Sequence, residues 1–417
     1  MLSLLKATWA LLLGVALIMA GNGLQASLLG LRGSLAGFSS SVMGIVMSGY
    51  YVGFLASSLL TPRGVRRVGH VRLFAALAAL ASVSALLAPI FVRPEVWFVL
   101  RAATGFCYAG LYVIGESWIN DRAGNETRGR LLSVYVLVQY VGLTGGQAML
   151  NLASPAGFEL FSMVAIAISV AVVPILIGVR QAPRFEQPRR VGLLQLYRVS
   201  PLAVLGVFFS GMAQSQFFSL GAVFGDRIGL DTGQVSLFMM MAVVGGFSLQ
   251  WPVGRTSDRF DRRRVMTAAS FASAMVACLA IPASSFSFLA LLAATFVYAG
   301  LSLPIYSLSV AHTNDFLKPD QMVSASSTMM MIYGCGAIGG PALGGFLMGR
   351  FGAYGFWGYI AAVHAGLALF ALYRMTRRPA RPREEQERFA ALPVSEPSSG
   401  HPALVPPTVK PGAPAGL

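Results

Sequence analysis

Long apolar runs, separated by short polar segments, follow one another along almost the whole chain. A helix that crosses a bilayer needs about 20 consecutive, mostly apolar residues, and the runs reach that length. Their residues do not alternate between apolar and polar, as they do in the strands of about ten residues that build a membrane β-barrel. The pattern therefore predicts an all-α polytopic membrane protein with twelve transmembrane helices. We expect these helices at 7–31, 40–60, 72–91, 96–119, 130–152, 158–177, 201–224, 235–253, 264–283, 286–310, 322–348 and 352–375.

The first run also has features of a secretory signal peptide, because Lys6 precedes it and small residues follow at Ala20 and Ala26. Its apolar character continues past Ala26 to Leu31, however, and its removal would leave an unpaired helix. We therefore expect this run to remain in the protein as the first transmembrane helix.

The amino-acid composition agrees with a membrane protein. Of the 417 residues, 55% are hydrophobic and only 11% are charged, whereas about a quarter of the residues of a soluble domain are charged. In a soluble protein the net charge of +15 would indicate a nucleic-acid partner. Here 26 of the 31 Lys and Arg residues fall on one side of the predicted membrane and four on the other. By the positive-inside rule both termini are cytoplasmic, and no nucleic-acid partner is expected.

A polar segment divides the predicted helices into six and six, and short motifs recur across it. Asn120–Asp121 and Gly145–Gly146 return 194 residues later as Asn314–Asp315 and Gly339–Gly340. Such a repeat indicates two six-helix halves related by pseudo-symmetry. The expected division is 1–178 for the N-terminal bundle, 179–200 for a cytoplasmic central loop, 201–376 for the C-terminal bundle and 377–417 for a disordered cytoplasmic tail.

The loop between predicted helices eight and nine has a distinctive order of Gly and charged residues, with Gly254, Asp258, Arg259 and Arg262. An Asp at a helix end can accept backbone N–H bonds and pair with neighbouring Arg side chains, which would hold two helix ends together. The order resembles the G-x-x-x-D-R-x-G-R signature of the major facilitator superfamily, with Asp261 in place of the second Gly. This resemblance implies a gating role for these residues, centred on Asp258. The alternative is a basic loop that only sets membrane topology.

Two further regions extend or limit this resemblance. The matching loop of the first half has Arg66 where the signature has Asp, so a latch is expected only in the second half. The segment from Glu116 to Arg128 resembles a bacterial subgroup of these transporters without assigned substrates, and we include Arg128 among the gating residues. The sequence around Pro341 in span eleven resembles a Pro-containing sequence element that drug antiporters carry in span five. Span five has no Pro here, so drug export is poorly supported.

The resemblance implies a secondary active transporter in the bacterial inner (plasma) membrane, working as a monomer on a small solute by alternating access. The alternative is a non-transporting membrane sensor or scaffold with the same fold. An ATP-driven pump needs a phosphate loop with Lys after Gly, and none of the three Lys residues follows Gly. We expect no enzymatic activity, no metal and no cofactor.

Polar residues inside the predicted helices are the candidates for a substrate cavity. Arg101 begins an R-x-x-x-G pattern that is similar to one in span four of the family, and an intramembrane Arg is costly and usually functional. The alternative is that Arg101 lies near the outer end and snorkels to the interface. At 100° per residue its helix face also carries Tyr108, Tyr112 and Glu116. Glu116 is either a protonatable coupling group, which makes protons a candidate partner, or an ion-pair partner of Arg66 or Arg122.

Polar residues beside Gly also interrupt spans one and seven at corresponding positions. Such interruptions point to a binding site near the middle of the membrane. Some of these side chains will instead form structural hydrogen bonds. The candidates are Asn22 and Gln25 in span one, Gln214 and Gln216 in span seven, and Tyr298 and Tyr306 in span ten.

Overall fold

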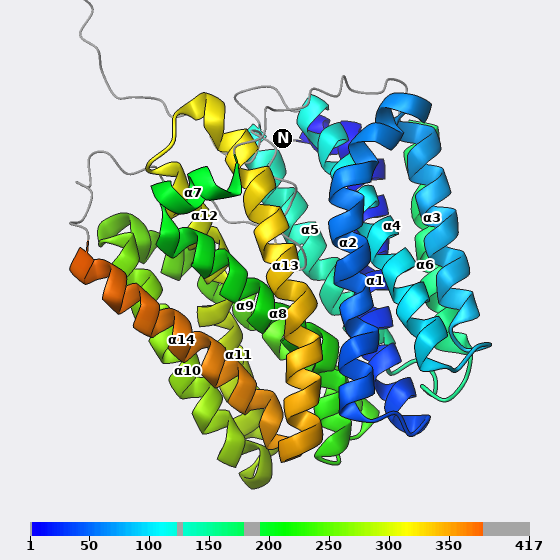
Figure 1. Ribbon diagram of the computed structural model, residues 1–417. Helices are drawn as coiled ribbons and strands as arrows, with labels where there is room; N and C mark the ends of the chain where they lie inside the picture. Colours follow the sequence, from blue (N-terminus) through cyan, green and yellow to red (C-terminus); the bar gives the residue numbers. More distant parts are fainter. Residues whose placement is uncertain (1, 123–127, 179–191, 378–417) are drawn as a thin grey trace, which may run out of the picture.

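The computed structural model is all-helical (Figure 1) and describes residues 2–122, 128–178 and 192–377. The helices are α1 (Leu2–Leu35), α2 (Ser40–Val68), α3 (His70–Leu87), α4 (Pro94–Arg122), α5 (Arg128–Met149), α6 (Glu159–Gly178), α7 (Leu193–Val199), α8 (Pro201–Arg227), α9 (Thr232–Arg259), α10 (Arg262–Phe286), α11 (Phe288–Ser302), α12 (Pro304–Asn314), α13 (Pro319–Phe351) and α14 (Tyr354–Arg377).

The predicted all-helical polytopic fold is confirmed. Within the described residues, eleven stretches are long and apolar enough to cross a membrane. The twelfth predicted span is α5, which has 22 residues and therefore sufficient length. Gln139 and Gln147 lower its hydropathy, which is why it falls outside the eleven.

The helices do not break where polar residues beside Gly interrupt the apolar runs. Span ten, expected as one helix, consists of α11 and α12, which separate at Leu303 because Pro304 lacks the N–H that would continue the ladder. By contrast, α1 and α8 run without a break through their polar segments around Asn22 and Gln214. The predicted central loop contains the short helix α7, and most of that loop, like most of the predicted tail, lies outside the described residues.

The internal repeat is visible in the helix contacts. Gly146 of α5 lies directly against the carbonyl oxygen of Ala20 in α1, and Gly340 of α13 lies in the same way against the carbonyl oxygen of Met212 in α8. A side chain at either Gly would overlap the neighbouring backbone, so the small residue sets the close approach of the two helices. The α1–α5 pair thus has the same construction as the α8–α13 pair.

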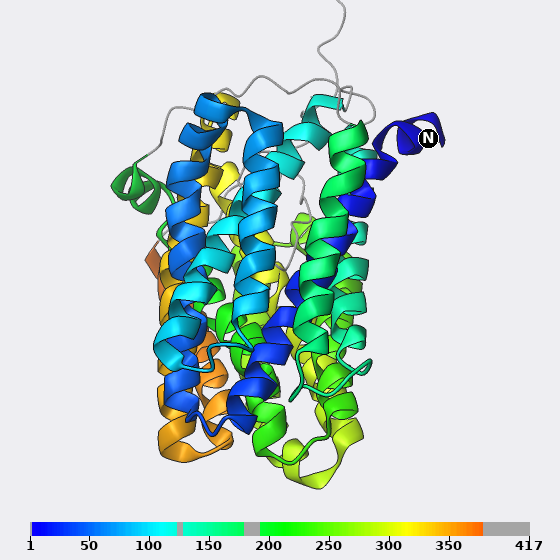
Figure 2. The ribbon, with the colours of Figure 1, turned by 90° about the vertical axis from the view of Figure 1, so that its right-hand side faces the viewer.

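The helices form two groups, α1–α6 and α8–α14. The groups are in contact where α2 packs against α13 and where α1 packs against α8. We call the end of the bundle that holds the N-terminus the basic end and the other the far end (top and bottom in Figures 1 and 2). At the far end Gly44 of α2 lies against Pro341 and Gly345 of α13, and Gly30 of α1 lies against Ala222 of α8. Toward the basic end the ribbons of α2 and α13 diverge (Figure 1).

Candidate functional site

A small cavity lies where the two groups of helices meet. It encloses about 40 Å³, which is room for roughly three water molecules at about 10–15 Å³ each. Helices α1, α2, α4 and α5 line one side and α8 lines the other. The lining includes Asn22, Tyr50, Tyr51, Arg101, Gln147 and Ser219.

Arg101 lies in the wall of this cavity and is only 4% exposed. Its guanidinium carbon is 4.5 Å from the centroid of the Tyr50 ring, a cation–π contact. Its Nε and Nη1 atoms have no hydrogen-bond partner among the described residues. The residue is seven positions into α4, about 10 Å along the helix axis at 1.5 Å per residue. The side chain is thus buried within the bundle.

Amides beside Arg101 complete the polar part of the wall. Asn22 donates to the Tyr112 hydroxyl at 3.1 Å, which brings two of the predicted cavity residues together. Gln147 donates to the carbonyl oxygen of Gly23 at 2.9 Å and accepts from the Ser27 hydroxyl at 2.7 Å, so its amide links α5 to α1. Gln147 was not predicted as a site residue, because the Gly145–Gly146 pair before it was interpreted only as part of the internal repeat.

The remaining members of the predicted cavity set are buried but do not line the cavity. Tyr108 packs between the rings of Tyr50 and Tyr112, and its hydroxyl has no hydrogen-bond partner among the described residues. The Oε1 atom of Gln25 is likewise buried and unpaired in that part of the chain.

The two predicted amides of α8 have structural partners instead. Gln214 donates to the carbonyl oxygen of Leu303 at 3.4 Å and accepts from the Tyr333 hydroxyl at 3.3 Å. Leu303 is the residue at the break between α11 and α12, so Gln214 satisfies a carbonyl next to that break. Gln216 donates to the carbonyl oxygen of Phe356 at 3.5 Å, which ties α8 to α14.

The two predicted tyrosines of span ten face different surroundings. Tyr298 packs against Phe217 and Trp357 in the aromatic core of the second helix group and accepts a hydrogen bond from Ser302. Tyr306 packs edge-on against Tyr333, with ring centroids 5.5 Å apart. Tyr298 is therefore a packing residue, whereas Tyr306 lies close to the meeting of the two helix groups.

Glu116 of α4 is 2% exposed. It interacts electrostatically with Tyr135 of α5 and with Tyr306 of α12, which belongs to the other helix group. A buried carboxyl group in this position faces both groups of helices. It lies nearer the basic end of α4 than Arg101, fifteen residues further along the same helix.

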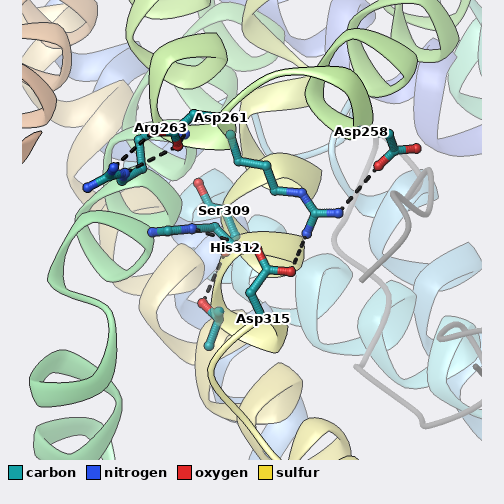
Figure 3. Close-up of polar contacts among 8 residues, drawn as sticks. Asp258, Asp261, Arg263, Ser309, His312 and Asp315 are labelled. Atoms are coloured by element: carbon teal, nitrogen blue, oxygen red, sulfur yellow. Dashed lines mark hydrogen bonds and ion pairs between the residues drawn. The ribbon is translucent and has the colours of Figure 1, made fainter. Parts of the chain in front are cut away.

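Two of the predicted gating residues, Asp258 and Arg262, belong to a network of ion pairs at the basic end, in the region that Figure 3 shows. The Nη1 atom of Arg262 is 2.8 Å from Asp315 Oδ1, and its Nη2 atom is 3.3 Å from Asp258 Oδ1. The Arg262 and Asp315 side chains are 1% and 2% exposed, whereas Asp258 is 36% exposed. The network thus joins the adjoining ends of α9, α10 and α12. Its buried ion pair is Arg262–Asp315. Asp258, the residue that the family signature emphasises, forms the more exposed contact.

Other members of the predicted gating set have simpler surroundings. Gly254 is buried and its carbonyl oxygen accepts from the Ser257 hydroxyl at 2.7 Å. Arg259 is exposed at the end of α9. The side chain of Arg128 lies outside the described residues. Asp315 was missed as a site residue although the repeated Asn–Asp motif contains it, because the repeat was interpreted only as evidence of symmetry.

Asp261, which departs from the family signature, has a local structural role. It is the N-cap of α10: its Oδ1 accepts from the backbone N–H of Arg263 at 3.0 Å, and its Oδ2 is 2.8 Å from Arg263 Nη2. Partial burial acts to raise the pKa of Asp261, but the hydrogen bonds and the charge of Arg263 outweigh it and hold the pKa below its usual value. The carboxylate therefore stabilises the start of α10.

The described residues contain no group of three or more His, Cys, Asp or Glu side chains that could hold a metal ion.

Sequence comparison identifies relatives across most of the chain. A family model described as Major Facilitator Superfamily matches residues 11–252 and 228–407. An uncharacterized MFS-type transporter from Enterobacter sp. (strain 638) is 25% identical over 308 residues, which cover 73% of this chain and 79% of that protein. The uncharacterized MFS-type transporter YcaD of Escherichia fergusonii is 23% identical over 308 residues, with the same coverage of 73% and 79%.

Solved structures share the fold at low sequence identity. The nucleoside transporter NupG has a TM-score of 0.72 at 13% identity, and the match covers 91% of this chain and 100% of NupG. A bacterial homologue of the human lysosomal transporter Spinster, inward-facing and unoccupied, has a TM-score of 0.64 at 14% identity, with coverage of 88% and 95%. The resemblance found in the sequence is confirmed: the chain belongs to the Major Facilitator Superfamily of membrane transporters, which are not enzymes.

Proposed function

We propose that the protein is a secondary active transporter that moves a small solute by alternating access around the cavity beside Arg101. The observation that carries this proposal is the position of the cavity, which is lined from both helix groups and has in its wall a buried guanidinium with no ion-pair partner among the described residues. Polar groups that converge in a cavity where two repeats meet are the usual construction of a transporter site.

The size of the cavity supports a requirement for movement. A space of about 40 Å³ admits only a few water molecules, and separation of the helix groups would make room there for a larger solute. The small-residue contact of α2 with α13 closes the far end, and the ion pairs at the basic end join α9, α10 and α12 within one helix group. These features support rocking of two rigid units.

We also propose that the basic end faces the cytoplasm, in the inner membrane of a bacterium. The 26-to-four distribution of Lys and Arg supports this orientation. Green fluorescent protein fused to the C-terminus should fluoresce and alkaline phosphatase fused there should be inactive. The opposite pair of results would reverse the assignment.

We also propose protons as the coupling ion, acting through Glu116. This carboxyl group is buried and faces Tyr306 across the meeting of the helix groups, so its charge can influence their relative position. An imposed pH gradient should change solute flux in proteoliposomes of the wild type and have no effect in Glu116→Gln. An equal response of both proteins would contradict a coupling role for Glu116.

The experiment that tests transport itself is solute flux in proteoliposomes, after a screen of the purified protein for metabolites that raise its melting temperature. We expect a stabilising metabolite to cross the membrane only in protein-containing vesicles. Stabilisation without flux under any imposed gradient would instead support the non-transporting sensor.

A further inference from the structure

Arg101 is a buried cation without an anion. Its Nε and Nη1 atoms are fully enclosed and have no acceptor among the described residues, and no carboxylate there forms an ion pair with it. A cation removed from water is costly unless a charge or good hydrogen bonds compensate for it. The protein retains this cost at the wall of its central cavity, which is where a ligand can compensate for it.

A cation–π contact compensates for part of the charge of the guanidinium. The guanidinium carbon lies 4.5 Å from the centroid of the Tyr50 ring, a contact that favours the charged form. The planar fork of Arg matches the two oxygens of a carboxylate or a phosphate. An anion of this shape is therefore the solute group that compensates best for the charge of Arg101.

The rest of the lining is neutral. No Asp or Glu is among the residues that surround the cavity, and the amides there already have partners: Asn22 donates to Tyr112, and Gln147 donates to Gly23. A cationic solute would therefore meet Arg101 without any opposite charge. A neutral solute could not supply the charge that the guanidinium lacks.

The cavity also contains apolar side chains and spans both helix groups. Leu143 of α5 and Phe218 of α8 complete its wall. Tyr51 of α2 and Ser219 of α8 both line the cavity beside Arg101, so the two helix groups meet there. A solute whose anionic group binds Arg101 would place its body against Phe218, on the opposite helix group.

We propose that the solute carries a carboxylate or phosphate group that binds the Arg101 guanidinium, with an uncharged body directed toward Leu143 and Phe218. This inference rests on the proposed transport function and specifies its substrate class. It assigns Arg101 to recognition of the solute rather than to helix packing.

The test uses the purified full-length chain in detergent and three probes with the same ring: benzoate, phenyl phosphate and the neutral amide benzamide. Dissociation constants are measured by calorimetry at constant ionic strength, with the melting temperature as a second readout. We expect benzoate or phenyl phosphate to bind at least tenfold more tightly than benzamide, and the tighter of the two identifies the anionic group. Equal affinity for all three, or no binding of either anion, would overturn the proposal.

Variants then assign the effect to Arg101. Arg101→Gln should reduce the affinity for the anion at least tenfold and leave that for benzamide unchanged, and Arg101→Lys should have an intermediate effect because it keeps the charge but loses the fork. Arg93→Gln, an exposed Arg in the loop before α4, is the matched control and should bind as the wild type does. Unchanged anion binding in a folded Arg101→Gln protein would contradict the assignment.

The result for recognition is separable from the result for transport. Anion binding through Arg101 without flux in proteoliposomes would contradict the transport function and leave the anion site intact. Flux of a neutral solute that is unaffected by Arg101→Gln would contradict the anion site and leave the transport function intact.

Discussion

At the scale of single residues, Arg262 illustrates how a charge within a membrane protein depends on its partner. Its side chain and that of Asp315 are almost fully buried and 2.8 Å apart. Arg262→Met should lower the free energy of unfolding by about 3–5 kcal/mol, because it removes the ion-pair partner that lies 2.8 Å from the buried Asp315 carboxylate. The measurement is chemical unfolding in detergent micelles, followed by circular dichroism.

The neighbouring Arg259 provides the control for this prediction, because it is exposed at the end of α9. Arg259→Met should change the free energy of unfolding by no more than about 0.5 kcal/mol. If both variants unfold alike, the buried ion pair of Arg262 does not stabilise the fold.

Asp261 gives a prediction about pH at the same scale. Its pKa in the folded protein lies below the ordinary value of 3.8, so the folded state favours the carboxylate more than the unfolded state does. Its contribution to stability is therefore complete above about pH 4 and declines as the pH falls toward the pKa of the folded state. The difference in melting temperature between wild type and Asp261→Asn should shrink between pH 6 and pH 3. A constant difference would show that the carboxylate charge is unimportant for capping α10.

At the scale of helices, run length and hydropathy predict the elements well but do not identify the broken one. Pro304 separates α11 from α12. Other helices continue through an internal Pro, since neighbouring groups in a bundle can satisfy the backbone groups that Pro releases. The helices that do so contain Pro62, Pro174, Pro252, Pro282 and Pro341. Which Pro breaks a helix thus depends on partners in three dimensions.

The same limit explains how far the sequence predicts the cavity. Asn22 and Arg101 were expected at the cavity and line it. Gln214 was selected by the same rule, but its amide pairs with the Leu303 carbonyl. Tyr51 and Ser219 line the cavity although nothing in their sequence context distinguishes them from packing residues. The sequence shows which side chains are polar, whereas the fold determines which backbone groups need a polar side chain as a hydrogen-bond partner.

The glycines of α5 and α13 give a matched prediction in both halves of the repeat. Gly146 and Gly340 lie against the backbone of neighbouring helices, whereas nothing lies within 4 Å of the position a Cβ would take at Gly145 or Gly339. Gly146→Ala and Gly340→Ala should destabilise the protein by about 1–3 kcal/mol through overpacking. Gly145→Ala and Gly339→Ala should be neutral or stabilise it by up to about 1 kcal/mol, because Ala favours a helix more than Gly does.

Unfolding of the four single variants in one detergent checks this prediction. The order of stability within each Gly pair should be the same in α5 and α13. An opposite order in the two helices would contradict the view that they are equivalent members of a repeat.

At the scale of the whole molecule, the contacts between the two helix groups give the transport proposal a mechanical test. At the far end of the bundle, Ser41 of α2 donates a hydrogen bond to the Gly345 carbonyl oxygen at 3.4 Å. A Cβ at position 349 of α13 would lie 3.7 Å from the Cβ of Ser41, within the range of about 3.5–4.5 Å that a disulfide needs. The protein therefore offers a site for a covalent link that keeps α2 and α13 together at this end.

Ser41→Cys with Gly349→Cys, made in a background where Cys107, Cys278 and Cys335 are replaced by Ala, should form this disulfide on oxidation. Alternating access requires α2 and α13 to separate at the far end once in each transport cycle, so the oxidised protein should lose nearly all solute flux in proteoliposomes. Reduction should restore it, and each single Cys variant should be insensitive to the oxidant. Full flux through a completely cross-linked protein would mean that the far end does not open, and that the solute takes a path other than one between these helix groups.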